Sequence, residues 1–282
     1  MRLSSRALSL ALLCAAASAR AVEPAAPAAQ PLALSPPAQA AAQPAPASRP
    51  MIMSTVGALG DFGLAPLHWD GGDWLAVGAV LGSAAVVWNN DVPLTRGLSS
   101  GDARKPWLDR SMPTVSWLGE GYMEALYAAA LYGIGGFGGS RLRATSGEAL
   151  QALAVVGVYS TVFKYAAWSN RPSQDDTQHK LFFYSQASQG MPSGHSFSAF
   201  AVAEVYGAEY GRWWTYPLAG LVAYSRIYNR AHFTSDVLVG GALGVATGIQ
   251  VRRTSAEEGP PLFQWGLAPG PDATLMTASV RF

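Results

Sequence analysis

The chain has 282 residues and a formal net charge of +1, with 50% hydrophobic and only 13% charged residues. The charged fraction is about half of the roughly 25% typical of soluble domains, so much of the chain must face either a core or a membrane. Lys and Arg (19) nearly balance Asp and Glu (18) and form no basic stripe, so we expect no nucleic-acid partner.

Residues 1–21 have the pattern of a secretory signal peptide. Arg2 and Arg6 precede the uncharged stretch Ala7–Ala17, and small residues follow it, as a cleavage site requires. The alternative is a retained anchor, but an apolar run of about a dozen residues is short for a bilayer. The single cysteine, Cys14, lies in this stretch, so the processed chain would contain no disulfide. We therefore expect export to a bacterial-type cell envelope.

Residues 22–50 are predicted to be a disordered tether. Eight of the 19 prolines lie between Glu23 and Pro50, interleaved with Ala and Gln, and large apolar side chains are almost absent. Such a segment cannot bury enough surface to offset the entropy of ordering it. We assign it no chemistry.

The body, residues 51–253, is predicted to be an all-α bundle of five or six helices. Its uncharged runs are each long enough for about three to four helical turns and lack the alternation of strands. None reaches the roughly eighteen apolar residues of a confident membrane span, yet tryptophans lie at the ends of several runs. Both a membrane-embedded and a soluble bundle therefore remain open, with the former slightly favoured. The runs are Trp74–Asn90, Ala125–Ser140, Ala149–Phe163, Trp213–Ser225 and Val237–Val251, with a shorter one at Ser196–Ala203.

The C-terminal tail, residues 254–282, is predicted to contain a short β-hairpin. Leu262–Leu267 and Thr274–Phe282 flank a Pro-Gly-Pro-Asp turn at Pro269–Asp272. An isolated hairpin is marginally stable, so it must pack on the helical body or be mobile. No function is assigned to it.

The first of three motifs is Lys164 followed, seven residues later, by Arg171-Pro172. Seven residues are about two helical turns, so on a continuous helix both cations would project from one face. Pro172 is expected to end that helix. Taken alone, such a pair is more often a solvated helix face than a binding site.

The second motif, Pro192-Ser193-Gly194-His195, opens a predicted helix. The first amides of a helix have no internal partner and attract anions, and Gly194 lets phosphate oxygens approach the backbone. His195 would then stand beside the bound anion, where an imidazole can give or take a proton. The alternative is a capped helix with an incidental histidine.

The third motif is Ser225-Arg226, then His232 and Asp236. His232 and Asp236 are four residues apart, so the carboxylate can accept a hydrogen bond from the imidazole and fix its tautomer. The other ring nitrogen then presents the lone pair that a nucleophile needs. Arg226 adds a planar fork suited to two phosphate oxygens. The alternative for His232 and Asp236 is a contact between two side chains at the protein surface.

Together the three motifs, in this order, resemble those of the type 2 phosphatidic acid phosphatase superfamily, which includes bacterial non-specific acid phosphatases and vanadium haloperoxidases. The pattern is Lys-x6-Arg-Pro, then Pro-Ser-Gly-His, then Ser-Arg-x5-His-x3-Asp, and every specified position is met. The resemblance covers Lys164–Asp236 by motif and about Trp74–Arg253 by helix count.

The resemblance implies a role for each motif residue. Lys164, Arg171 and Arg226, with the amides near Ser193 and Gly194, would form a cage for a phosphoryl group. His232 would attack phosphorus and form a phosphohistidine, Asp236 would hold its ring, and His195 would protonate the leaving oxygen and then activate water. This scheme needs no metal and no cofactor. His68 and His179 match no motif and are interpreted as loop or packing residues, although His179 could border the substrate entrance.

The expected function is therefore hydrolysis of a phosphomonoester or pyrophosphate carried by a lipid at a membrane, outside the cytoplasm. The alternatives are a soluble periplasmic acid phosphatase, a vanadium haloperoxidase, and a non-catalytic protein that binds lipid phosphates.

Overall fold

The computed structural model describes residues 51–137, 139–182 and 189–258, together with two strands at residues 263–269 and 274–280. The predicted signal peptide and tether, residues 1–50, lie outside the described residues. The all-α prediction for the body is confirmed, since the regular elements described between residues 51 and 258 are α-helices and short 3-10 helices.

The described residues form nine α-helices, more than the five or six expected. The additional ones, α2, α4 and α5, include short or charge-bearing segments that a search for long uncharged runs passes over. The helices are α2 (Met51–Leu64), α3 (Gly71–Trp88), α4 (Asp91–Ser99), α5 (Pro106–Leu118), α6 (Gly121–Gly135), α7 (Ser140–Ala167), α8 (Gly194–Tyr210), α9 (Arg212–Tyr228) and α10 (Thr234–Glu258).

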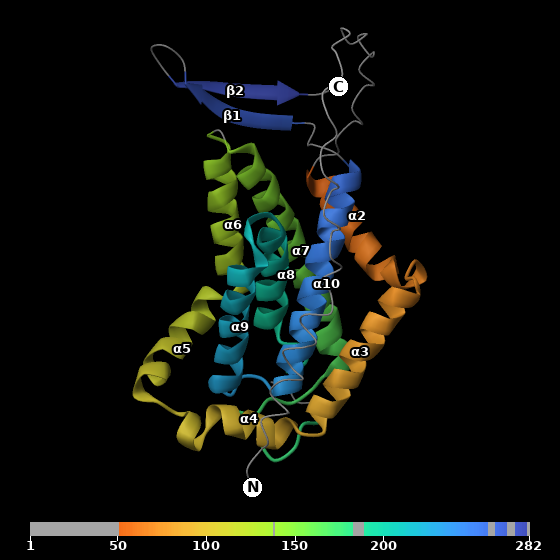
Figure 1. The fold of residues 1–282 in the computed structure, drawn as a ribbon, viewed down its shortest axis with the longest axis vertical. Helices are drawn as coiled ribbons and strands as arrows, with labels where there is room; N and C mark the ends of the chain where they lie inside the picture. The colour runs from red at the N-terminus through yellow and green to blue at the C-terminus, as the bar shows by residue number, and fades with distance from the viewer. Residues whose placement is uncertain (1–50, 138, 183–188, 259–262, 270–273, 281–282) are drawn as a thin grey trace, which may run out of the picture.

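Helices α6 to α10 form an elongated bundle around α8 (Figure 1), which contacts each of the other four. Apolar side chains of α8, among them Phe197, Ala201 and Val205, are fully buried and meet Val155 of α7 and Val251 of α10 in the main core. Helices α2 and α3 flank α10, and α4 lies across the end of the bundle opposite the hairpin. This end holds the start of α8 and α10 and the end of α7 and α9.

Glycines allow α8 and α10 to pack with their backbones in contact. A Cβ atom on Gly240 would lie 2.5 Å from the carbonyl oxygen of Ser193, and one on Gly244 would lie 2.4 Å from that of Phe197. Real Cβ atoms do not approach so closely, so larger residues would force the two helices apart. The close packing places the N-terminus of α8 beside that of α10, which brings the second and third motifs together.

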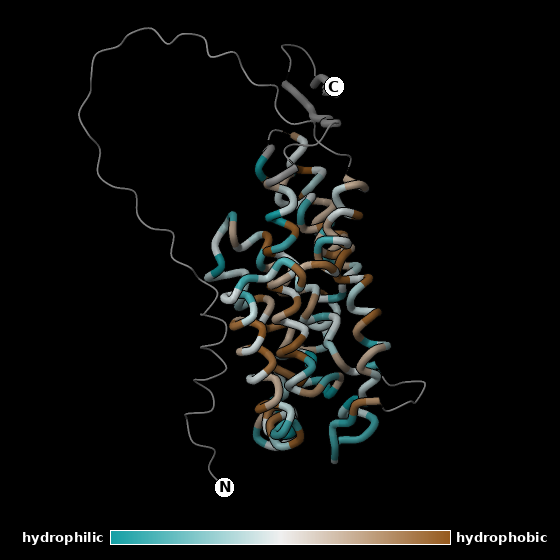
Figure 2. Tube along the Cα trace, turned by 90° about the vertical axis from the view of Figure 1, so that its right-hand side faces the viewer, coloured by the Kyte–Doolittle hydropathy of each residue, from teal (hydrophilic) through white to brown (hydrophobic). Residues whose placement is uncertain are grey.

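Three helices are long and apolar enough to cross a membrane by length and composition. They are α3, the segment Arg141–Ala167 of α7 and the segment Thr234–Ala256 of α10. Only 6% of the α3 window is buried, so nearly all of its apolar surface faces outward. Hydrophobic positions are spread along the middle of the bundle (Figure 2).

The two strands form the expected hairpin. β1 (Phe263–Pro269) and β2 (Thr274–Val280) pair antiparallel, with Phe263 opposite Val280 and Pro269 opposite Thr274. The preceding helix, α10, continues to Glu258, five residues past the expected end of the helical body at residue 253.

Candidate active site

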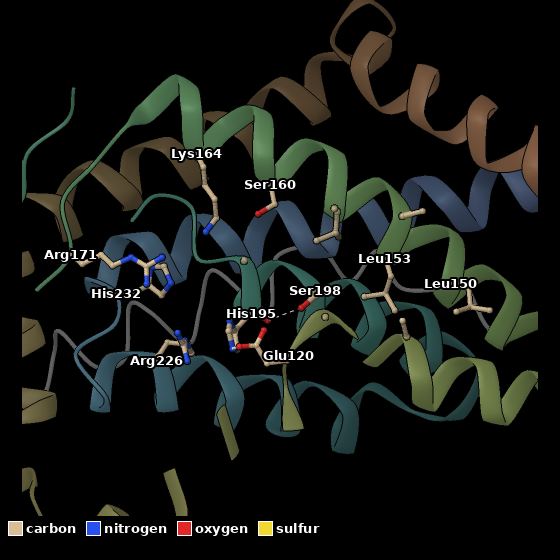
Figure 3. A pocket seen from close by; sticks show the side chains of 16 residues that line it. Glu120, Leu150, Leu153, Ser160, Lys164, Arg171, His195, Ser198, Arg226 and His232 are labelled. Carbon is tan, nitrogen blue, oxygen red and sulfur yellow. Dashed lines mark hydrogen bonds and ion pairs between the residues drawn. The ribbon is translucent and has the colours of Figure 1, made fainter. Parts of the chain in front are cut away.

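The three motifs meet at one cavity of about 670 Å³. Figure 3 shows basic side chains and imidazoles at one end of this cavity, with Leu150 and Leu153 of α7 at the other. The arrangement therefore joins a cationic chamber to an apolar arm. The motif residues that line the cavity are Lys164, Arg171, Gly194, His195, Arg226 and His232.

Lys164 and Arg171 share the cavity, but for a different reason from the one expected. Helix α7 ends at Ala167, where Trp168 adopts a left-handed conformation with φ of 41°, so Arg171 is not on the helix at all. The chain turns back after Ala167 and brings Arg171 beside Lys164. The Lys164 ammonium and the Arg171 guanidinium both donate to the carbonyl oxygen of Gln189, each at 3.4 Å.

Asn170 organises the loop that follows Arg171. Its buried side-chain amide donates to the carbonyl oxygens of Asp175 (3.0 Å) and Gln178 (2.9 Å), and its oxygen accepts from the amide of Lys180 (2.6 Å). These three bonds satisfy a buried polar side chain and set the path of residues 171–180. That path also places His179, as described below.

The second motif begins α8 as predicted. Ser193 is the N-cap, its hydroxyl accepting from the amide of Ser196 at 3.5 Å, while its own amide donates to the backbone carbonyl of Asp236 at 3.0 Å. Ser193 is fully buried and does not line the cavity. Its amide therefore joins α8 to α10 and its hydroxyl caps α8, and its phosphate contact stays a prediction.

Gly194 faces the cationic chamber directly. A Cβ atom there would lie 3.4 Å from the hydroxyl oxygen of Ser160 and 3.9 Å from the ammonium nitrogen of Lys164. The missing side chain thus leaves space between the first turn of α8 and the Lys164 ammonium. An anion in this space would meet helix amides on one side and a cation on the other.

Arg226 reaches the cavity from the last turn of α9, which ends at Tyr228. Its guanidinium donates to the hydroxyl of Ser116, a buried residue of α5. Helix α5 therefore orients the third cation of the chamber, although no sequence motif includes Ser116.

His232 and Asp236 lie next to each other, as the four-residue spacing of the third motif predicted. His232 lies just before α10 and Asp236 in its first turn, and both side chains are at most 2% exposed. His232 Nδ1 lies 3.4 Å from Asp236 Oδ2, which also accepts from the amide of Phe233 at 2.9 Å. Because Nδ1 faces the carboxylate, Nε2 is the ring nitrogen left to face the cavity.

His195 has a carboxylate neighbour that the sequence analysis did not identify. His195 Nε2 lies 3.1 Å from Glu120 Oε1, just before α6, and the two side chains are 12% and 40% exposed. The available signal was weak: Glu120 and Glu124 stand one turn apart at the start of an otherwise uncharged run. Glu120, Ser160 and Ser198 complete the polar lining, and Ser198 donates to the carbonyl of His195 at 3.3 Å.

Burial and nearby cations lower the pKa of both imidazoles of the cavity, which favours their neutral form. Burial, followed by the nearby charge of Arg226, lowers the pKa of His195 to about 3. Burial also lowers the pKa of His232 to about 4, assisted by Arg171 and Arg226 and opposed by Asp236. A neutral His232 keeps the lone pair that nucleophilic attack requires.

The interpretation of His179 as a loop or packing residue, or as a border of the substrate entrance, is incomplete. Its side chain is 2% exposed and contacts two carboxylates, Asp91 and Asp236. His68, by contrast, is an exposed residue whose Nδ1 lies 3.3 Å from the carbonyl oxygen of Leu64. Among the described residues, no group of three or more His, Cys, Asp or Glu side chains is placed to hold a metal ion.

Residues 147–259 match the family model described as the PAP2 superfamily, which confirms the resemblance inferred from the three motifs. A lipid A 1-phosphatase of Porphyromonas gingivalis is 41% identical over 68 residues, a stretch that covers 22% of this chain and 15% of that protein.

Two solved structures are similar over part of the chain. LpxE of Aquifex aeolicus is 24% identical, with a TM-score of 0.47. The match covers 58% of this chain and 95% of the LpxE chain. The second is a transmembrane PAP2-type phosphatidylglycerolphosphate phosphatase of Bacillus subtilis, which is 20% identical with a TM-score of 0.45. The match covers 73% of this chain and 94% of the phosphatase chain.

Proposed function

We propose that this chain, whose residues 147–259 belong to the PAP2 superfamily, is a phosphatase that hydrolyses a phosphomonoester or pyrophosphate of a lipid. The observation that carries the proposal is the convergence of three basic side chains, from α7, the following loop and α9, on the cavity that His232 and His195 line. Such an arrangement suits a tetrahedral anion placed within reach of a nucleophile.

In the proposed reaction, Lys164, Arg171 and Arg226 neutralise the non-bridging oxygens of the phosphoryl group as charge develops in the transition state. His232 Nε2 attacks phosphorus in line with the bond to the leaving oxygen. That bond breaks as the phosphorus–nitrogen bond forms, which gives a phosphohistidine. Asp236 holds the Nδ1 proton of His232 and stabilises the positive charge that the ring gains.

His195 acts as the acid and then as the base. Burial and the surrounding cations lower its pKa. A bound phosphoryl dianion offsets that positive charge and raises the pKa, so His195 gains a proton when substrate binds. It donates this proton to the leaving oxygen, then removes one from the water that attacks the phosphohistidine and releases phosphate.

The apolar arm of the cavity favours a lipid as the leaving group. Leu150 and Leu153 of α7 line this arm (Figure 3), and Ala154 of α7 and Ala125 of α6 also line the cavity. The outward-facing apolar surface of α3 favours a membrane location, since soluble monomers rarely expose large apolar patches. A lipid A 1-phosphatase is among the relatives, which places lipid phosphates first among the substrates to be tested. We further propose that the site faces the extracytoplasmic side of the envelope.

The proposal is tested by phosphate release from wild-type protein and from His232→Ala. Because the nucleophile is lost while the cage remains, we expect the variant to lose at least about 1,000-fold in kcat. Acid-labile, base-stable labelling of the wild type by radiolabelled substrate would report the phosphohistidine. His68→Ala is the matched control, since His68 is exposed and lies outside the cavity. Substantial turnover by His232→Ala would refute the assignment.

The same preparation should keep its activity in EDTA and lose it to vanadate, which resembles five-coordinate phosphorus. A panel that contains lipid A, phosphatidate, phosphatidylglycerol phosphate, an isoprenoid pyrophosphate and a soluble phosphomonoester identifies the substrate class. Preference for the soluble ester would favour an acid phosphatase, and bromide oxidation by the vanadate-loaded protein would favour a haloperoxidase. Binding without any turnover would indicate a lipid-phosphate-binding protein.

A further inference from the structure

A second buried imidazole contacts the side of Asp236 that faces away from His232. His179 Nε2 lies 3.4 Å from Asp236 Oδ1, and His179 Nδ1 lies 2.7 Å from Asp91 Oδ2. The side chains of His179 and Asp91 are 2% and 1% exposed. His232, Asp236, His179 and Asp91 therefore form a continuous row of alternating imidazoles and carboxylates that leads away from the cavity.

The surroundings of His179 hold its ring in one orientation. The ring is stacked between Trp88 (centroids 3.8 Å apart) and Phe233 (4.2 Å), with interplanar angles of 26° and 20°. Asp91, at the start of α4, is fixed in turn by Ser235, whose amide donates to Oδ1 at 2.8 Å and whose hydroxyl donates to Oδ2. Since the ring cannot rotate freely between two aromatic faces, each nitrogen keeps its own carboxylate.

The two carboxylates determine the charge that suits His179. A neutral imidazole carries one N–H and can donate to only one of them, whereas an imidazolium donates to both. Two buried carboxylates without a cation between them would be strongly destabilising. Burial opposes the charged form, but the contacts with Asp236 and Asp91 outweigh it and raise the pKa of His179.

We propose that His179, held by Asp91, is a positioning residue for the nucleophile: it fixes the Asp236 carboxylate from behind and sets the charge that His232 faces. The inference rests on the phosphatase function proposed above. Asp91 and Trp88 lie outside the residues that match the family model, so this support comes from helices α3 and α4.

The loss of this imidazolium would change the pH dependence in a defined direction. The charged groups that face His179 are Asp91 from α4 and Asp236 from α10, and Arg171 and Arg226 act on His232. Without the positive ring of His179, the negative charges of Asp236 and Asp91 are no longer balanced. The surroundings of His232 become more negative, which favours the protonated form of His232. The pKa of His232 then rises, so the acid limb of kcat/KM moves to higher pH.

The test compares His179→Phe, His179→Gln and Asp91→Asn in the full chain, with a soluble phosphomonoester as substrate. We expect kcat to fall about 10- to 100-fold in His179→Phe, the range found for residues that orient a reacting group, with little change in KM. His179→Gln should retain more activity, because its amide can still donate to Asp236. The acid limb should move to higher pH in both His179 variants. Asp91→Asn also removes a negative charge, so it should lower kcat with a smaller shift of the acid limb.

A double-mutant cycle with Asp236→Asn separates positioning from general stability. If His179 acts through Asp236, His179→Phe should cost much less kcat in the Asp236→Asn background than in the wild type. Glu204→Gln is the structural control, because it removes a buried carboxylate bonded to Arg212 and Tyr216 and lies outside the row. It should lower thermal stability but leave the acid limb in place.

Equal losses in both backgrounds, or an unshifted acid limb in His179→Gln, would overturn the inference. Should His179→Phe fail to fold, the Gln and Asn variants carry the test, because they preserve size and polarity. Failure of the phosphatase proposal has a different signature: the wild-type chain would then release no phosphate, or His232→Ala would release it as well.

Discussion

At the scale of single residues, position in the fold decides what each histidine can do. His195 and His232 lie among cations in a buried cavity that lowers their pKa, whereas His179 lies between two carboxylates that raise its pKa. The sequence places His195 and His232 in motifs and His179 in none, but it gives the charge of none of the three. The proposed nucleophile, His232, needs an unprotonated ring nitrogen for its attack on phosphorus. The proposed positioning residue, His179, needs a proton on both ring nitrogens to donate to its two carboxylates.

Gly194 provides a test of the anion position at this scale. In Gly194→Ala, the new methyl group would make only ordinary contacts with Ser160 and Lys164, so the fold should be retained. The methyl would occupy the space in which we expect the phosphoryl oxygens. A displacement of about 1 Å at a reacting centre lowers the rate about 100-fold. We therefore expect kcat/KM to fall about 100-fold and the vanadate inhibition constant to rise about 100-fold.

Gly157→Ala is the matched control for this experiment. Gly157 also lines the cavity, but a Cβ atom there has nothing within 4 Å. This variant should leave vanadate inhibition unchanged. A Gly194→Ala enzyme with wild-type vanadate inhibition would place the anion elsewhere.

At the scale of helices, the site depends on where helices end and how closely they pack. Lys164 lies in the last turn of α7, Arg226 in the last turn of α9, and His195 in the first turn of α8. Since these ends lie at the same end of the bundle, their side chains share one cavity. The contact of α8 with α10 fixes their relative position through Gly240, Gly244 and Gly248.

Gly244→Ala should therefore destabilise the protein. Its Cβ atom would lie 2.4 Å from the carbonyl oxygen of Phe197 and 2.9 Å from the amide of Ala201, both of which are backbone atoms that cannot rotate away. Overpacking of this kind costs about 1 to 3 kcal/mol in the free energy of unfolding. Thermal unfolding in detergent should show a lower midpoint, and activity should fall as the two helix N-termini separate.

Gly220→Ala on α9 is the control for helix propensity. A Cβ atom at Gly220 meets nothing within 4 Å, so this substitution should be neutral or stabilise the helix by up to about 1 kcal/mol. Equal midpoints for the two variants would show that the α8–α10 contact is less tight than the glycines indicate.

At the scale of the whole molecule, the distribution of apolar surface predicts how the protein is attached to the envelope. Leu75 and Leu81 of α3 are 75% and 62% exposed within a helix long enough to span a bilayer. We expect the chain to stay with membranes after high-salt and carbonate washes and to leave them only in detergent.

The double variant Leu75→Lys/Leu81→Lys distinguishes a membrane from water around α3. In a bilayer each lysine near the helix centre costs about 2.5 to 3.5 kcal/mol, so the membrane-bound fraction should fall. In water the same changes would only improve solubility. Leu67→Lys, in the short 3-10 helix Ala65–Leu67, is the control and should leave the distribution unchanged. Release of wild-type protein by carbonate alone would favour the soluble alternative.

The sequence by itself determined the helical class, the C-terminal hairpin and the three motifs, because these follow from composition, alternation and fixed local spacing. It predicted the His232–Asp236 contact correctly, since four residues of separation near a helix start constrain the geometry. It was wrong about how Arg171 meets Lys164, because the left-handed turn at Trp168 ends α7 early.

Only the tertiary structure decided which groups surround these motifs. Ser116 beside Arg226, Glu120 beside His195, and Asp91 beside His179 join segments that are far apart in the chain. No local period or spacing encodes such contacts, because they depend on how α4, α5 and α6 pack against the bundle. The charge of a buried imidazole depends on those neighbours, so it too was settled by packing rather than by the motif in which the histidine stands.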